Sequence, residues 1–127
     1  MVQLIIGGIS MPTVVGDNYR CYEEDSSKTL RTIDGSLVTE LGYAHRVIEY
    51  TLGKDQFLPF ETRRDLMAML KSKQEIEVMY MSPETNMLEG EAFVCTTVPK
   101  PSATYVSGGV IYWNLTTIKL EGVNPIA

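Results

Sequence analysis

Glutamates that alternate along one segment are the first groups in this sequence that could do chemistry. Glu75 and Glu77 would point to one face of a strand, roughly 7 Å apart. Two carboxylates at such a separation can act as acid and base in glycoside hydrolysis. Here they alternate with apolar residues, which is typical of the solvent-facing side of an amphipathic strand. We therefore predict a solvated surface, and a small carboxylate hydrolase is the third hypothesis.

The single histidine, His45, could bind a metal or act as a base. A metal site needs further ligands at suitable spacing, and none lies near His45 in the sequence. A Ser-His-Asp triad could be composed of Ser36, His45 and Asp34, but no G-x-S-x-G motif places the serine as a nucleophile. We predict a surface histidine, no catalytic residue, no metal and no cofactor.

Two cysteines, Cys21 and Cys95, fall in predicted strands. A disulfide between them is one alternative, but two cysteines form no framework and buried free thiols are common. The glycine pairs Gly7–Gly8 and Gly108–Gly109 lack the strand-loop-helix context and the following lysine of a phosphate-binding loop. We predict free thiols and no such loop.

Aromatic residues gather around the second glycine pair. Tyr105, Tyr112 and Trp113 could stack on a sugar ring or anchor an interface. Trp113 could instead lie in the core with Ile111 and Leu115, and we favour that position because tryptophan is highly buried on average. Tyr105 and Tyr112 stay as candidate interface residues.

The elements that would position these residues are mostly strands. Alternating apolar residues predict strands in the segments 3–12 (around a Gly-Gly turn), 18–25, 42–53, 75–81, 90–99 and 110–120, with a hairpin at 29–40. One helix is predicted near residues 59–72, with Pro59 in its first turn. Short turns between strands indicate an antiparallel β-sandwich or barrel of about seven or eight strands, with the helix covering an open edge or end.

The last apolar run changes phase part way. Ile111, Trp113 and Leu115 share one face, whereas Ile118 and Leu120 share the other. Such a change predicts a β-bulge or a strand that crosses from one sheet to a second.

The hairpin at 29–40 carries the Asp34–Gly35 pair, which is preferred in two-residue type I′ turns. Its strands are too polar to be buried on both faces. We expect an arm that pairs with the sheet edge of a neighbour, with Arg31, Asp34, Gly35 and Leu37 as interface residues.

Length and charge restrict the domain count and the partners. A chain of 127 residues fits one domain, here with a loose tail at 121–127. The net charge of −5 argues against specific nucleic-acid binding. No run approaches the roughly 20 apolar residues that span a bilayer, and the N-terminus lacks a signal-peptide pattern. We expect a soluble chain made in the cytoplasm, with no membrane partner.

The order of several segments resembles the small tail-region structural proteins of phages and prophages of Gram-positive bacteria. The segments are LIIGGISMP, TIDGSLVTE, RVIEYTLG, PFETRRDLMAMLKS, EIEVMYMSPETN and VIYWNLTTIKLEGV. The resemblance implies a non-enzymatic virion protein with a tail-tube or distal-tail-like β-sandwich, made in the host cytoplasm. It also implies ring assembly of the chain with itself, usually in six copies, and contact with other phage tail proteins.

Charge and length bear on this expectation. An acidic chain suits a lumen through which DNA must slide, since like charges repel. The segments 23–31 and 100–108 read as long loops that could reach a neighbouring subunit. Because 127 residues is short for a tube protein, connector and baseplate-proximal positions stay open. The alternative function is a carbohydrate-binding or host-recognition module that uses an aromatic surface.

Overall fold

The structure, a computed structural model, describes residues 2–25, 28–31, 37–40, 44–53 and 56–124. Side chains are not described at residues 25, 28–31, 37–40 and 105. The elements in chain order are β1 (Leu4–Ile6), β2 (Ile9–Ser10), the 3-10 helix η1 (Gly16–Asn18), β3 (Tyr19–Asp25), β4 (Lys28–Arg31), β5 (Leu37–Glu40), β6 (Ala44–Tyr50), α1 (Phe60–Lys71), β7 (Ile76–Met81), β8 (Leu88–Thr97), β9 (Pro101–Ser107), β10 (Val110–Leu115) and β11 (Ile118–Gly122). The predicted fold class, mainly β and antiparallel with one helix, is confirmed.

Seven of these strands form one antiparallel sheet in the order β2-β1-β7-β8-β11-β6-β3. Strand β7 shows why its sequence forms such an element, because Ile76, Val78 and Tyr80 are buried while Glu77 and Met79 are exposed. This alternation gives the sheet one apolar face. That face forms a single hydrophobic core with residues of the helix and of the N-terminal segment.

Helix α1 packs on this core through a narrow stripe. Leu66 and Leu70 are fully buried, four residues apart on one side of the helix. Pro59, at the N-cap, has a φ of −55° that suits a helix start, and Lys71 lies in the last turn, where a positive charge is favourable. Phe60, six residues before Leu66, lies off this stripe and is exposed.

Both glycine pairs form two-residue hairpin turns. Gly7 and Gly8, with φ of 54° and 87°, join β1 to β2, and Gly108 and Gly109, with φ of 58° and 76°, join β9 to β10. Such turns need positive φ at both central residues. The segment 100–108 is therefore mostly strand β9, and its prediction as a long loop was wrong.

Two further boundaries differ from the prediction. In the segment 23–31, read as a loop, the described residues belong to β3 and β4. Glu121 and Gly122, which were predicted to belong to a loose tail, lie in β11 and pair with β8. In each case cross-strand pairing extends an element that has little local apolar signal.

The predicted crossing between sheets is confirmed. Among the described strands, β10 pairs only with β9, whereas β11 lies between β8 and β6 in the seven-stranded sheet. Leu115 and Ile118, on either side of the crossing, are both buried. Residues three positions apart in one continuous strand would point to opposite faces, so the chain changes its orientation at the two residues between them. A register shift also occurs between Tyr112 and Trp113.

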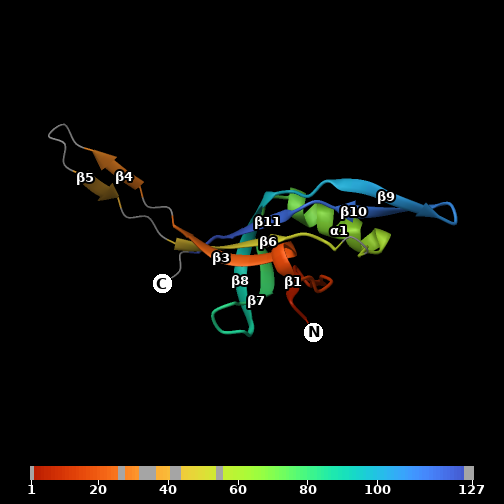
Figure 1. Cartoon of the computed structure of the whole chain (residues 1–127), viewed down its shortest axis with the longest axis horizontal. Helices are drawn as coiled ribbons and strands as arrows, with labels where there is room; N and C mark the ends of the chain where they lie inside the picture. The colour runs from red at the N-terminus through yellow and green to blue at the C-terminus, as the bar shows by residue number, and fades with distance from the viewer. Residues whose placement is uncertain (1, 26–27, 32–36, 41–43, 54–55, 125–127) are drawn as a thin grey trace.

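Two hairpins extend from the body at opposite ends, β4–β5 at one end and β9–β10 at the other (Figure 1). Strands β4 and β5 pair from Lys28–Glu40 to Arg31–Leu37, near the hairpin predicted at 29–40, and Asp34 and Gly35 lie outside the described residues. The register pairs Arg31 with Leu37, whereas a two-residue turn at Asp34–Gly35 would pair Arg31 with Val38. Within the described part of the chain, no helix has the length and apolar character needed to cross a membrane.

Candidate functional site

A cleft of about 520 Å³ lies between the start of α1 and strand β10. The segment before the helix contributes Phe57, Leu58 and Pro59, the first helical turn contributes Phe60 and Arg63, and β10 contributes its residues from Val110 to Trp113. Most of these side chains are aromatic or aliphatic, and Arg63 is the charged one. A cleft with this lining favours an apolar ligand group.

Ring contacts organise the walls of the cleft. Phe57 and Tyr112 meet edge to face, with their ring centroids 5.5 Å apart. The guanidinium of Arg63 lies 5.7 Å from the ring centroid of Trp113 and 5.7 Å from that of Phe60. These are cation–π distances, so the arginine links the helix to the hairpin.

Trp113 therefore lies at the surface of this cleft. The prediction that it belongs to the core was wrong, because it is half-buried and does not belong to the core cluster. The physical reason is that β10 leaves the main sheet and pairs only with β9, so the core receives only Leu115 from this strand.

The hairpin beside the cleft exposes apolar side chains. Val106, Val110 and Ile111 are 65%, 55% and 46% exposed, and Phe60 of the helix is exposed next to them. Of the predicted interface residues, Tyr112 lines the cleft, and Tyr105 lies opposite it in the register of β9 and β10. Of the other four, Arg31 and Leu37 lie in the distant hairpin β4–β5, and Asp34 and Gly35 lie outside the described residues.

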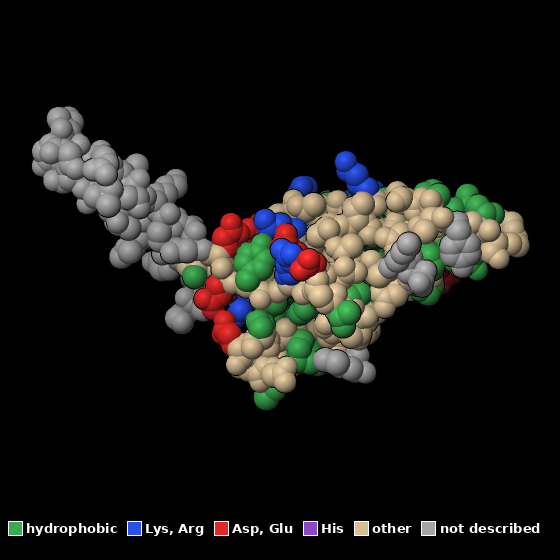
Figure 2. Space-filling model, viewed as in Figure 1, with side chains coloured by type: hydrophobic (Ala, Val, Ile, Leu, Met, Phe, Trp, Pro, Cys, Tyr) green, Lys and Arg blue, Asp and Glu red, His purple; other side chains and the backbone are tan. Residues whose placement is uncertain are grey.

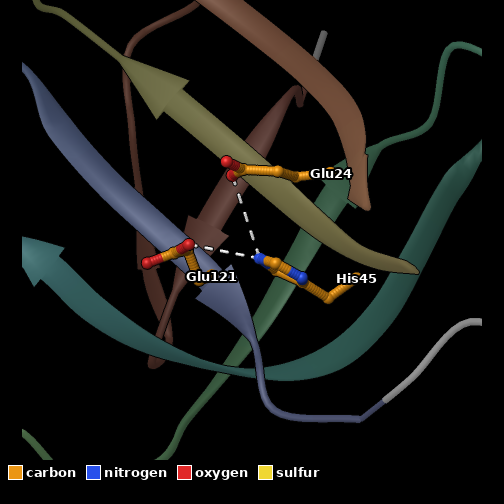
Figure 3. A group of neighbouring side chains, drawn as sticks. All are labelled: Glu24, His45 and Glu121. Atoms are coloured by element: carbon orange, nitrogen blue, oxygen red, sulfur yellow. Dashed lines mark hydrogen bonds and ion pairs between the residues drawn. The ribbon is translucent and has the colours of Figure 1, made fainter. Parts of the chain in front are cut away.

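The opposite end of the body is acidic and contains His45. Its Nε2 atom lies 3.2 Å from Oε1 of Glu121 and 3.9 Å from Oε2 of Glu24 (Figure 3). The predicted surface histidine is thus half-buried between two carboxylates. Partial burial alone would raise the pKa of Glu121, but hydrogen bonds from Thr96 and His45 outweigh it and leave that pKa below its ordinary value.

A second charged cluster, centred on Arg46, lies at the same end of the core. Arg46 is almost fully buried, and its guanidinium lies 3.2 Å from Glu84, 3.8 Å from Glu23 and over the ring of Tyr80. The hydrogen bond from Arg46 lowers the pKa of Glu84, whereas the hydrogen bond to Glu84 raises the pKa of Glu23. The two carboxylates thus differ in proton affinity because only Glu84 is bonded directly to the arginine.

The remaining sequence candidates show no assembled chemistry in the described residues. Glu75 and Glu77 are exposed, as predicted for a solvated surface. Ser36 and Asp34 of the possible triad lie outside the described residues. Cys21 and Cys95 are free thiols; burial raises the pKa of Cys21 to about 11 and also raises that of Cys95.

The sequence analysis did not identify the residues that contact Trp113 in the cleft or His45 in the acidic cluster. Phe57 and Phe60 flank Pro59 in a short aromatic segment, which could have been noted as a surface candidate. No local sequence pattern indicates that this segment lies close to Trp113. Likewise, Glu24 is the register partner of His45 only because β3 pairs with β6.

No protein-family model matches the chain, and no curated protein matches it either.

Proposed function

We propose that this chain is a non-enzymatic structural protein of a phage or prophage tail that assembles head to tail with copies of itself. The observation that carries the proposal is the β9–β10 hairpin, which is paired only with itself and exposes apolar side chains. The resemblance in segment order supports the phage assignment, and with it a virion location and contacts with other tail proteins.

The hairpin argues for association because a two-stranded ribbon gains little stability in water by itself. Its cross-strand pair Val106–Ile111 leaves both side chains exposed. Contiguous apolar surface of this kind, together with Phe60 and the cleft, is typical of a surface that a protein partner covers.

The opposite end of the body offers a complementary surface. Strand β3 ends the seven-stranded sheet, and no other described strand pairs with its outer edge. Acidic side chains gather at this end (Figure 2), among them Glu23, Glu24 and Glu84. The cleft end presents Arg63 and exposes apolar side chains over the hairpin. Two different surfaces at the two ends favour a heterologous contact, which produces a ring when the rotation closes.

A neighbouring copy is therefore the occupant that we assign to the cleft end. Its open β3 edge can accept the hairpin by strand addition, and its carboxylates can approach Arg63. A sugar fits this cleft less well, because burial of hydroxyl groups requires several hydrogen-bonding side chains and the lining is mainly apolar. The aromatic rings Tyr112 and Trp113 keep a carbohydrate-binding module as the alternative.

A paired substitution in the hairpin tests the association. Val106→Lys combined with Ile111→Glu should weaken self-association roughly tenfold or more, which is about 1.4 kcal/mol or more. The two residues are register partners, so the new opposite charges stabilise the hairpin while they remove its apolar surface. Sedimentation velocity over a wide concentration range, with negative-stain microscopy for rings, measures the change.

The matched control is Val2→Lys combined with Met79→Glu. Both residues are exposed, neither lines the cleft nor lies in β3 or in the loop that carries Glu84, and the net charge is unchanged in the same way. The control should associate like the wild type. A wild-type chain that stays monomeric at high concentration would refute self-assembly. Glycan binding that Trp113→Ala abolishes in such a monomer would favour the carbohydrate module.

A further inference from the structure

We propose that Glu24, His45 and Glu121 form a binding site for a divalent transition-metal ion of the zinc class. The three side chains come from β3, β6 and β11 and converge on one point (Figure 3). One donor atom from each residue lies within 4.8 Å of the other two. This site shares Glu24 with the acidic end that we assign to self-association, but metal binding by a single chain is measured separately from assembly.

The donor spacing is close to that of a coordinated ion. Ligand bonds of about 2.0–2.1 Å in a tetrahedral site place the donor atoms about 3.3 Å apart. The distance from His45 Nε2 to Glu121 Oε1 is 3.2 Å, and that to Glu24 Oε2 is 3.9 Å. A small side-chain rotation of Glu24 would therefore complete the triangle.

Strand pairing holds the three ligands in place. Glu24 lies directly opposite His45 in the β3–β6 register, and Glu121 lies opposite Val47, which is two residues from His45 on the same face of the sheet. The side chains of His45 and Glu121 are each 25% exposed, whereas that of Glu24 is 50% exposed. Two ligands are thus partly fixed by packing, and the third can adjust.

The donor set indicates which ions would bind. One imidazole nitrogen and two carboxylate oxygens suit Zn²⁺, Co²⁺ or Mn²⁺, whereas Ca²⁺ and Mg²⁺ prefer oxygen ligands alone. Three protein ligands leave a further coordination position for water.

Metal binding would also join the three strands at the base of the β4–β5 hairpin. Strand β3 leads toward this hairpin and β6 follows it in the chain. Because an ion that binds the folded state selectively stabilises it, excess Zn²⁺ should raise the melting temperature. A rise of roughly 5 °C is the expected size for a chain of this length.

Titration of the metal-free chain with Zn²⁺ tests the site directly. Isothermal calorimetry measures affinity and stoichiometry, and NMR of the imidazole follows the ligand itself. Since His45 is the single histidine, the one imidazole signal reports on this site alone. We expect saturation at one ion per chain with a shift of that signal.

Variants separate the site from adventitious binding. His45→Gln should weaken Zn²⁺ binding roughly 100-fold and Glu121→Gln roughly tenfold, as loss of a ligand predicts. Glu77→Gln removes an exposed carboxylate on β7 and should leave the affinity unchanged. Circular dichroism confirms that each variant is folded.

Three outcomes would overturn the proposal. The first is no heat and no imidazole shift with Zn²⁺ or Co²⁺, which would leave His45 as the centre of an ion pair only. The second is binding that His45→Gln does not weaken. The third is a cobalt–thiolate charge-transfer band in the Co²⁺ complex, which would place the ion on a cysteine.

Discussion

Replacing Leu66 with alanine should destabilise the fold by about 2–5 kcal/mol, because it removes a large side chain from a fully packed position. Leu66 is completely buried, and α1 attaches to the sheet mainly through this residue and Leu70. Urea unfolding followed by circular dichroism measures the loss. A large part of the effect should come from the cavity that the sheet cannot fill.

This substitution should also weaken self-association. The first turn of the same helix carries Phe60 and Arg63, which form one wall of the cleft. Lys71→Ala, at an exposed position of the helix, is the matched control and should change stability by less than about 0.5 kcal/mol. Equal unfolding midpoints for Leu66→Ala and Lys71→Ala would show that α1 does not depend on this contact.

Gly7→Ala should destabilise the fold by about 1–3 kcal/mol, since the added Cβ atom strains the backbone, crowds Ile76 and displaces the flexible end of the Met69 side chain. Gly7 has a φ of 54°, where a side chain is strained. A Cβ atom there would clash with the Sδ atom of Met69 and lie 3.3 Å from Cγ2 of Ile76. Thermal and urea unfolding should both detect the change.

Substitution of the neighbouring Gly8 separates the effect of backbone strain from that of the steric contact. Gly8 also has a positive φ, of 87°, but a Cβ atom there meets nothing within 4 Å. Gly8→Ala should therefore cost only the backbone strain, about 1–2 kcal/mol. Combining Gly7→Ala with Met69→Ala should recover part of the loss in a double-mutant cycle. No coupling between the two substitutions would argue against the close approach of Met69.

Periodicity predicted the elements where one face is buried. Strand β7 alternates as its sequence does, and the helix expected near residues 59–72 runs from Phe60 to Lys71. The prediction failed for a strand that is formed by hydrogen-bonded pairing with its neighbour and does not bury one apolar face. The segment 100–108 carries polar residues and a proline, yet it forms β9 because β10 folds back on it.

Trp113 shows a second limit of local patterns. Its alternation with Ile111 and Leu115 is compatible with a core strand, and only Leu115 reaches the core. Alternation gives the two faces of a strand, but it does not say which layer covers each face. Here the hairpin extends past the body, so one aromatic face remains at the surface.

The strands with alternating residues, the helix and the Gly-Gly turns can be predicted from local sequence, because they depend on sterics and burial within a few residues. The meeting of Glu24, His45 and Glu121, and the position of β10 against the start of α1, depend on how the strands are ordered in the fold. Glu24 and His45 are 21 positions apart in the sequence, and His45 and Glu121 are 76 positions apart. Contacts over such distances depend on strand order and register, which no local pattern encodes.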